Sequence, residues 1–133
     1  NKQYKRTELN DFIYSSNNLD VGSIGLNKYG SAVISDVYEI FTIKGADISF
    51  IAEAICRPQT IAKILKYRQG VIYGQYRIYA ENFLEVDICL PPIKEQIKYS
   101  QLLTKLDDRI VRESTVLKDL SEIRLGLLQR LFI

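Results

Sequence analysis

The sequence contains no histidine, no methionine and no tryptophan, and only two of its 133 residues are cysteine. Without histidine, imidazole-based acid–base catalysis and Ser-His-Asp triads are excluded. Cys56 and Cys89 each stand alone, which argues against a zinc site or a disulfide framework and indicates a reducing, cytoplasmic environment. We therefore expect a protein that is not an enzyme and that holds no metal and no cofactor.

Phosphate-cradling motifs are missing as well, since neither GxxxxGK[ST] nor GxGxxG occurs. No apolar run approaches the ~20 residues that a helix needs to cross a bilayer, so we expect no membrane partner. The chain begins at Asn1 and has no methionine, from which we expect it to be a piece of a longer protein. The remaining composition, 47% hydrophobic and 26% charged, is that of one globular domain with an appendage.

The first two thirds of the chain predict short strands and then short helices. Residues 11–16, 23–26, 31–35 and 37–43 are rich in β-branched and aromatic residues and are separated by Asn- and Gly-containing turns. Two helices are expected next, one capped by Asp47 and one with Pro58 in its first turn.

A hairpin over 71–79 that bends at Gly74, and a strand over 82–92, complete the expected domain. Together these elements predict a small, mixed, β-rich α+β domain with two short helices over residues 1–91. One long C-terminal helix follows, over residues 92–133.

The long helix begins after Pro91 and Pro92, and between Ile93 and Phe132 the sequence has no proline and only Gly126 as a glycine. Its apolar residues recur in a heptad, which is typical of a coiled coil. The predicted helix interface consists of Tyr99, Leu103, Leu106, Ile110, Leu117, Leu120, Leu127 and Leu131. Because a bare apolar row favours association, we expect self-association, with two such helices antiparallel, or docking to a partner.

Positive charge is concentrated in one segment, although the net charge is only +2. Between Ala54 and Ala80 there is no acidic residue, and such a local basic field suits phosphate binding. Lys and Arg can neutralise phosphates, while Arg and Gln can also make bidentate contacts to base edges. The candidate DNA-binding residues are Lys63, Lys66, Arg68, Gln69, Tyr73, Gln75, Tyr76 and Arg77, together with Lys5 and Arg6.

The same residues also fit a solvated basic helix with tyrosines in the core. Arg77 can equally pair with Glu85 or Asp87 within the sheet. Ser15, Ser16 and Asn17 lie at a predicted strand end, from which their polar side chains could reach a DNA groove.

Short motifs near the end of the chain resemble those of a known family. The stretches "LPPIKEQ", "LLTKLDD" and "LGLLQRLF", in this order, are similar to the region that closes a target recognition domain in the specificity subunit of type I restriction–modification systems. The matching residues are Leu90, Pro91, Pro92, Glu95, Gln96, Leu103, Asp107, Gly126, Leu127, Leu128, Gln129, Leu131 and Phe132. "GSIGLNKYGSAVISDVYEIFTIK" and "YGQYRIYAENFLEV" are also similar, so the resemblance covers most of the chain.

The resemblance implies a non-catalytic DNA-recognition domain that reads one half of a bipartite site in double-stranded DNA. It also implies that the long helix is a spacer that docks the methyltransferase subunits and, through them, the restriction subunit. Members of the family carry two such domains and two such helices, so this chain would be a fragment. The alternative is a coiled-coil interaction module without direct DNA contact.

Overall fold

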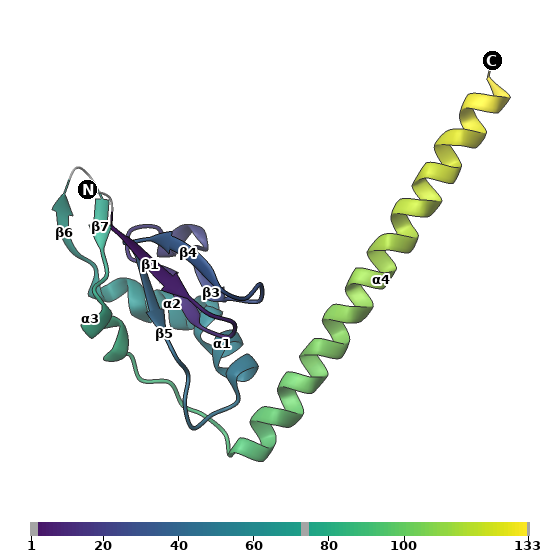
Figure 1. The fold of residues 1–133 in the computed structure, drawn as a ribbon. Helices are drawn as coiled ribbons and strands as arrows, with labels where there is room; N and C mark the ends of the chain where they lie inside the picture. Colours follow the sequence, from purple (N-terminus) through teal and green to yellow (C-terminus); the bar gives the residue numbers. More distant parts are fainter. Residues whose placement is uncertain (1–2, 73–74, 133) are drawn as a thin grey trace. The chain divides into compact units, whose positions relative to one another are not determined.

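The computed structural model describes residues 3–72 and 75–132, and the chain divides into two compact units, Asn1–Gln96 and Ile97–Ile133 (Figure 1). We call them unit 1 and unit 2. Unit 1 combines small antiparallel sheets with short helices, and unit 2 is part of one long helix. The predicted class, a mixed α+β domain followed by a long C-terminal helix, is confirmed.

Unit 1 contains small antiparallel sheets. Their strands are β1 (Tyr4–Thr7), β2 (Phe12–Ser15), β3 (Ile24–Leu26), β4 (Ala32–Ser35), β5 (Tyr38–Phe41), β6 (Gln69–Ile72) and β7 (Gln75–Arg77). β1 pairs with β4, β2 lies between β3 and β5, and β6 pairs with β7 in a hairpin. The strands expected between residues 11 and 43 and the hairpin are confirmed, whereas β1 was not predicted because it is short and polar and only Thr7 of its four residues is buried.

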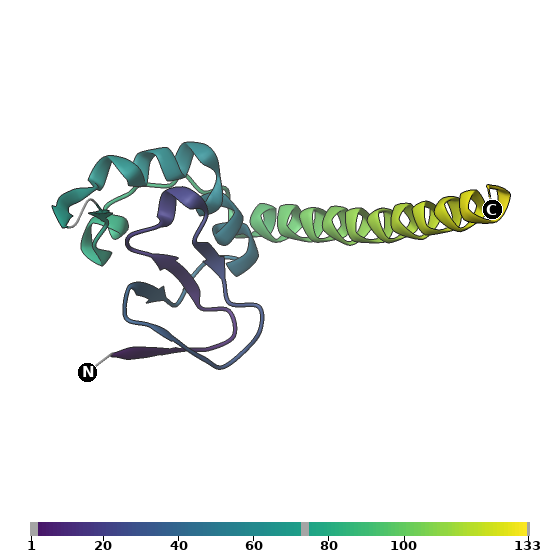
Figure 2. The ribbon, with the colours of Figure 1, turned by 90° about the horizontal axis from the view of Figure 1, so that it is seen from above.

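The helices are η1 (Leu19–Val21), α1 (Ile48–Cys56), α2 (Pro58–Ile64), η2 (Leu65–Tyr67), α3 (Ala80–Leu84) and α4 (Ile93–Leu131), of which η1 and η2 are 3-10 helices. Within unit 1, α1 and α2 lie along one side of the strands, as Figure 2 shows. The Asp47 carboxylate caps α1 by accepting the Phe50 N–H at 2.8 Å, and Pro58 is the first residue of α2. Both predicted helix starts are confirmed.

An aromatic stack forms the centre of the core. The ring of Phe83 lies 4.4 Å from that of Tyr14 and 5.3 Å from that of Phe41. The buried apolar residues around it are Phe12, Tyr14, Leu19, Ile51, Ala52, Ile55, Ile64, Ile78 and Phe83. The core therefore joins β2 to helices α1, α2 and α3.

The strand expected over residues 82–92 is wrong, because its first residues belong to α3 and the remainder is not a strand. The apolar residues Phe83 and Val86 suggested a strand. However, Ala80, Glu81 and Leu84 are good helix formers, and one helical turn is enough to place the Phe83 ring in the aromatic stack. Tertiary packing thus decided the local structure, and unit 1 has a third short α-helix.

α4 runs from Ile93 to Leu131, as the heptad predicted, and its 39 residues span about 58 Å at ~1.5 Å per residue. The first turn of α4 belongs to unit 1, because Gln96 in this turn is 5% exposed and its side chain makes two hydrogen bonds to other residues of unit 1. The Gln96 amide donates to the Pro91 carbonyl at 2.7 Å and accepts the Asp47 N–H at 3.0 Å. Among the helices of the described residues, none is both long and apolar enough to cross a membrane.

Candidate nucleic-acid interface

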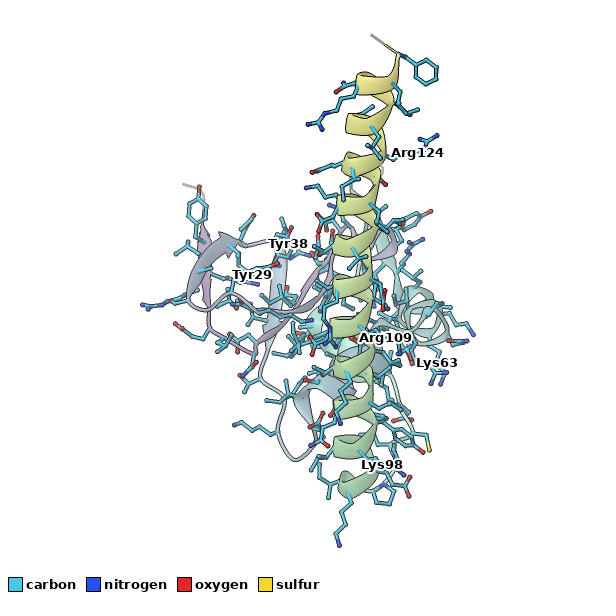
Figure 3. The ribbon with its side chains drawn as sticks, turned by 90° about the vertical axis from the view of Figure 1, so that its right-hand side faces the viewer. Tyr29, Tyr38, Lys63, Lys98, Arg109 and Arg124 are labelled. Atoms are coloured by element: carbon cyan, nitrogen blue, oxygen red, sulfur yellow. The ribbon has the colours of Figure 1, made fainter. Side chains whose placement is uncertain are left out.

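Lys63 and Lys66 are exposed on α2 and η2, as predicted for residues that contact phosphate. Figure 3 shows Lys63 on one side of unit 1, and Tyr29 and Tyr38 on the other. Over the ranges 3–72 and 75–132, no carboxylate lies within 4 Å of either ammonium group. The two lysines are therefore available to a negatively charged partner.

Arg68 is held by two neighbours. Its Nη2 donates to Asp20 Oδ2 at 2.6 Å, and its guanidinium lies 5.5 Å from the centre of the Tyr76 ring. The ion pair connects the chain just before β6 to η1, which is 48 residues away in sequence. Tyr76 is half-exposed, so the predicted pair Arg68 and Tyr76 forms one cation–π contact at the surface of the hairpin.

The amide of Gln69 also has an internal partner, because its Nε2 donates to Asn82 Oδ1 at 3.0 Å. This bond connects β6 to α3. Of the other hairpin candidates, Gln75 pairs with Ile72 across the sheet through the backbone. Tyr73 lies outside the described residues.

The Glu39 carboxylate forms ion pairs with two of the predicted DNA-binding residues, Lys5 and Arg77. The Lys5 ammonium donates to Glu39 at 2.9 Å and to the Tyr38 carbonyl at 2.7 Å, and Arg77 Nη2 lies 3.9 Å from Glu39. Arg77 also stacks over Tyr79 at 5.2 Å. The expected pairing of Arg77 with Glu85 or Asp87 is wrong, because the carboxylate within 4 Å of the Arg77 guanidinium is that of Glu39.

The hydroxyls of Ser15 and Ser16 do not reach a surface, and the expectation that they could enter a groove is wrong. Both residues are at most 2% exposed, and the N–H of Ile78, the residue after β7, bonds to the Ser16 carbonyl at 3.0 Å. Asn17 is partly exposed, so its part of the expectation stays a prediction. Arg6 is exposed and donates to Glu8 at 2.9 Å. Lys5, Arg6, Arg68 and Arg77 are thus all charge-compensated, unlike Lys63 and Lys66.

The predicted helix interface lies on one long element, α4. All eight residues, Tyr99, Leu103, Leu106, Ile110, Leu117, Leu120, Leu127 and Leu131, are between 39% and 73% exposed. The helix carries ion pairs outside this row, such as Lys118 with Glu122 at 4.0 Å. The row has the heptad spacing of an association surface.

The titratable groups with shifted pKa values lie in the core, away from the basic face. Burial, helped by Glu39 and Glu81, raises the pKa of Tyr14, whose hydroxyl donates to the Ile78 carbonyl at 3.1 Å. Burial and Glu53 raise the pKa of the Cys56 thiol, which keeps it protonated. In the part of the chain that the structure describes, no three His, Cys, Asp or Glu side chains are grouped so that they could hold a metal ion.

A shallow apolar groove of about 360 Å³ lies between the sheets, near Tyr29 and Tyr38 in Figure 3. Two of its polar side chains are already engaged: Thr7 bonds to Asp11 at 3.2 Å, and Asn27 donates to the carbonyls of Glu8 and Gly30. The groove offers apolar surface without convergent polar groups.

Three residues that organise this region carried no recognisable sequence signal. Asp20, Glu39 and Asn82 meet their partners only through contacts 13 to 48 residues apart. Gln59 could have been predicted from the sequence as a DNA-binding candidate, because it lies four residues before Lys63 on the same predicted helix. Its side chain is exposed and makes no hydrogen bond to any other described residue.

The fold and the site define a small α+β unit with an exposed basic helix face, joined to a long helix with an apolar row. No protein-family model matches the sequence, and no curated protein matches it.

Proposed function

We propose that this chain is a non-catalytic, sequence-specific DNA-binding piece of a type I restriction–modification specificity subunit. The observation that carries the proposal is the exposed pair Lys63 and Lys66, which stands in a segment without acidic residues and without a carboxylate within 4 Å among the described residues. The motif resemblance of the C-terminal region supports the same class. Unit 1 would read one half of a bipartite duplex site.

Electrostatics favour duplex DNA as the partner of this face. A duplex carries one negative charge per ~1.7 Å, so cations that lack internal counterions gain most from displacing its condensed ions. The net charge of +2 adds little attraction at long range, and binding should therefore depend on the local cations. Arg57, exposed just before α2, adds a third cation to Lys63 and Lys66.

α4 would serve as the spacer and the docking element for the methyltransferase subunits. Each leucine of the apolar row contributes roughly 1.5–3 kcal/mol when it is buried, so a row of eight apolar and aromatic residues strongly favours a partner. A second copy of the chain, paired antiparallel, would imitate the two helices of a full subunit. The complex would work in the cytoplasm.

The test is duplex binding by the full 133-residue chain, measured by fluorescence anisotropy between 50 and 200 mM salt. With three phosphate-contacting cations, the slope of log Kobs against log salt should be about −2.7, which weakens binding about 40-fold over this range. A chain that binds no duplex at 50 mM salt, or binds with no salt dependence, would contradict the proposal.

A coiled-coil interaction module without DNA contact is the second candidate. It is favoured by the compensation of Lys5, Arg6, Arg68 and Arg77 by internal carboxylates, which leaves only Lys63 and Lys66 uncompensated among the six predicted DNA-binding cations. In that case substitutions in the apolar row of α4 would abolish partner binding, and charge changes on unit 1 would have no effect.

A further inference from the structure

We propose that duplex DNA lies against one face of α2 and η2, and that Gln59 on this face reads a base edge. The α2–η2 face is defined by Gln59, Ala62, Lys63 and Lys66, all of which are exposed. This inference rests on the proposed DNA-recognition function and names the element that carries it out.

The spacing of the four residues places them on one side of the helix. Gln59, Lys63 and Lys66 follow each other by four and three residues, which is the repeat of one helix face. Ile61, Ile64 and Leu65 point to the opposite side, where Ile64 is 1% exposed and the other two pack against the core. The core therefore holds the helix rigidly while the face stays open.

The side chains of the α2–η2 face are free to bind DNA, whereas the other candidate cations are paired with carboxylates of unit 1. Lys5, Arg6, Arg68 and Arg77 each lie within 4 Å of a carboxylate, and a phosphate would have to compete with that carboxylate. The side chains of Gln59, Lys63 and Lys66 make no hydrogen bond or ion pair to another residue of the described ranges. DNA can bind these three side chains without breaking an internal contact.

The dimensions and chemistry of the face suit the major groove. Gln59 and Lys66 are separated by about 10 Å along the helix at ~1.5 Å per residue, while the groove is about 12 Å wide. A glutamine amide can donate to N7 and accept from N6 of adenine, and a small exposed alanine such as Ala62 can contact the thymine methyl group. Lys63 and Lys66 then lie close enough to the backbone to neutralise phosphates.

The experiment compares variants of the full chain for salt dependence and for base preference. Lys63→Gln should reduce the magnitude of the salt slope by about 0.9 and weaken binding equally for all sequences, and Lys63→Arg should restore both. Lys28→Gln is the matched control, because Lys28 is also exposed and precedes Tyr29 in the chain, and Figure 3 shows Tyr29 on the other side of unit 1 from Lys63. It removes the same charge and should leave the slope unchanged.

Base preference is measured by selecting a random duplex library with the wild type and with Gln59→Ala. The wild type should enrich an A·T pair at one position, and Gln59→Ala should lose about 5- to 150-fold of discrimination at that position alone. Its binding to unselected duplex should stay unchanged.

Failure of this inference can be distinguished from failure of the proposed function. If the wild type binds no duplex, both are overturned. If it binds but Lys63→Gln behaves like Lys28→Gln while Arg68→Gln loses binding, the hairpin is the contact surface and the α2–η2 face is not. An unchanged selected sequence with Gln59→Ala, or no preference in the wild type, overturns base reading by Gln59.

Discussion

Replacement of Gln96 by leucine should destabilise unit 1, because this buried side chain holds two backbone groups together. Its amide accepts the Asp47 N–H at 3.0 Å and donates to the Pro91 carbonyl at 2.7 Å. Leucine has a similar volume and can do neither. Each buried hydrogen bond contributes about 0.5–1.5 kcal/mol, and each unsatisfied buried partner costs about 1–3 kcal/mol.

Asp47 and Pro91 are only half-buried, so water can partly replace the lost bonds. We therefore expect Gln96→Leu to lower the free energy of unfolding of unit 1 by about 2 kcal/mol, which lies in the lower part of the summed costs of the two lost hydrogen bonds and their two unsatisfied partners. With a urea dependence of about 1–2 kcal/mol per molar, the midpoint should fall by about 1–2 M. Gln96→Glu keeps the acceptor for Asp47 but cannot donate to Pro91, so its loss should be intermediate.

Urea unfolding followed by tyrosine fluorescence is the appropriate assay, since the chain has no tryptophan and eight of its nine tyrosines precede Gln96. Gln101→Leu is the matched control, because the Gln101 side chain is exposed on α4 and makes no hydrogen bond to a described residue. Its midpoint should match that of the wild type. Equal midpoints for Gln96→Leu and Gln101→Leu would refute the role assigned to Gln96.

Two further outcomes are expected. The raised pKa of Tyr14 means that the folded state binds this proton more tightly than the unfolded state, so its stabilising effect is present below about pH 10 and is lost as the pH rises further. Tyr14→Phe, which also removes the bond to Ile78, should be about 1 kcal/mol less stable at pH 8, and urea midpoints should show this difference shrinking above pH 10. A constant difference would contradict the assignment. Self-association, measured by sedimentation velocity, should be abolished when Gln replaces Leu106, Ile110, Leu117 and Leu120 together. It should persist in the double variant Val111→Gln and Leu125→Gln, because these two residues lie outside the row. A wild type that is monomeric at micromolar concentration would contradict pairing.

Local sequence patterns predicted the secondary structure correctly where a pattern extended over many residues or depended on one stereochemical requirement. α4 was predicted over residues 92–133 and runs from Ile93 to Leu131, because an apolar heptad that recurs along a helix of 39 residues is compatible with few other structures. Asp47 and Pro58 identified the two helix starts, because a capping carboxylate and a proline in the first turn have few other uses. The exposure of Lys63 and Lys66 followed from the same helical spacing.

Prediction failed where distant residues decided the outcome. β1 reads as a polar segment, yet it pairs with β4 from Tyr4 opposite Ser35 to Thr7 opposite Ala32. α3 reads as a strand until Phe83 is seen to fill the space beside Tyr14 and Phe41. Short elements of this kind have weak intrinsic preferences, so the free energy of packing determines them.

For the candidate site as well, the sequence predicted the basic segment, and the tertiary structure decided which of its charges are free. By itself, the sequence determined that residues between Ala54 and Ala80 form an acid-free segment and that a long helix with an apolar row follows it. Only the tertiary structure decided which cations are available, because Asp20 and Glu39 reach Arg68, Arg77 and Lys5 from elements far away along the chain. A charge is free or compensated according to what lies within a few ångströms of it, and that distance is determined by the packing of the whole unit.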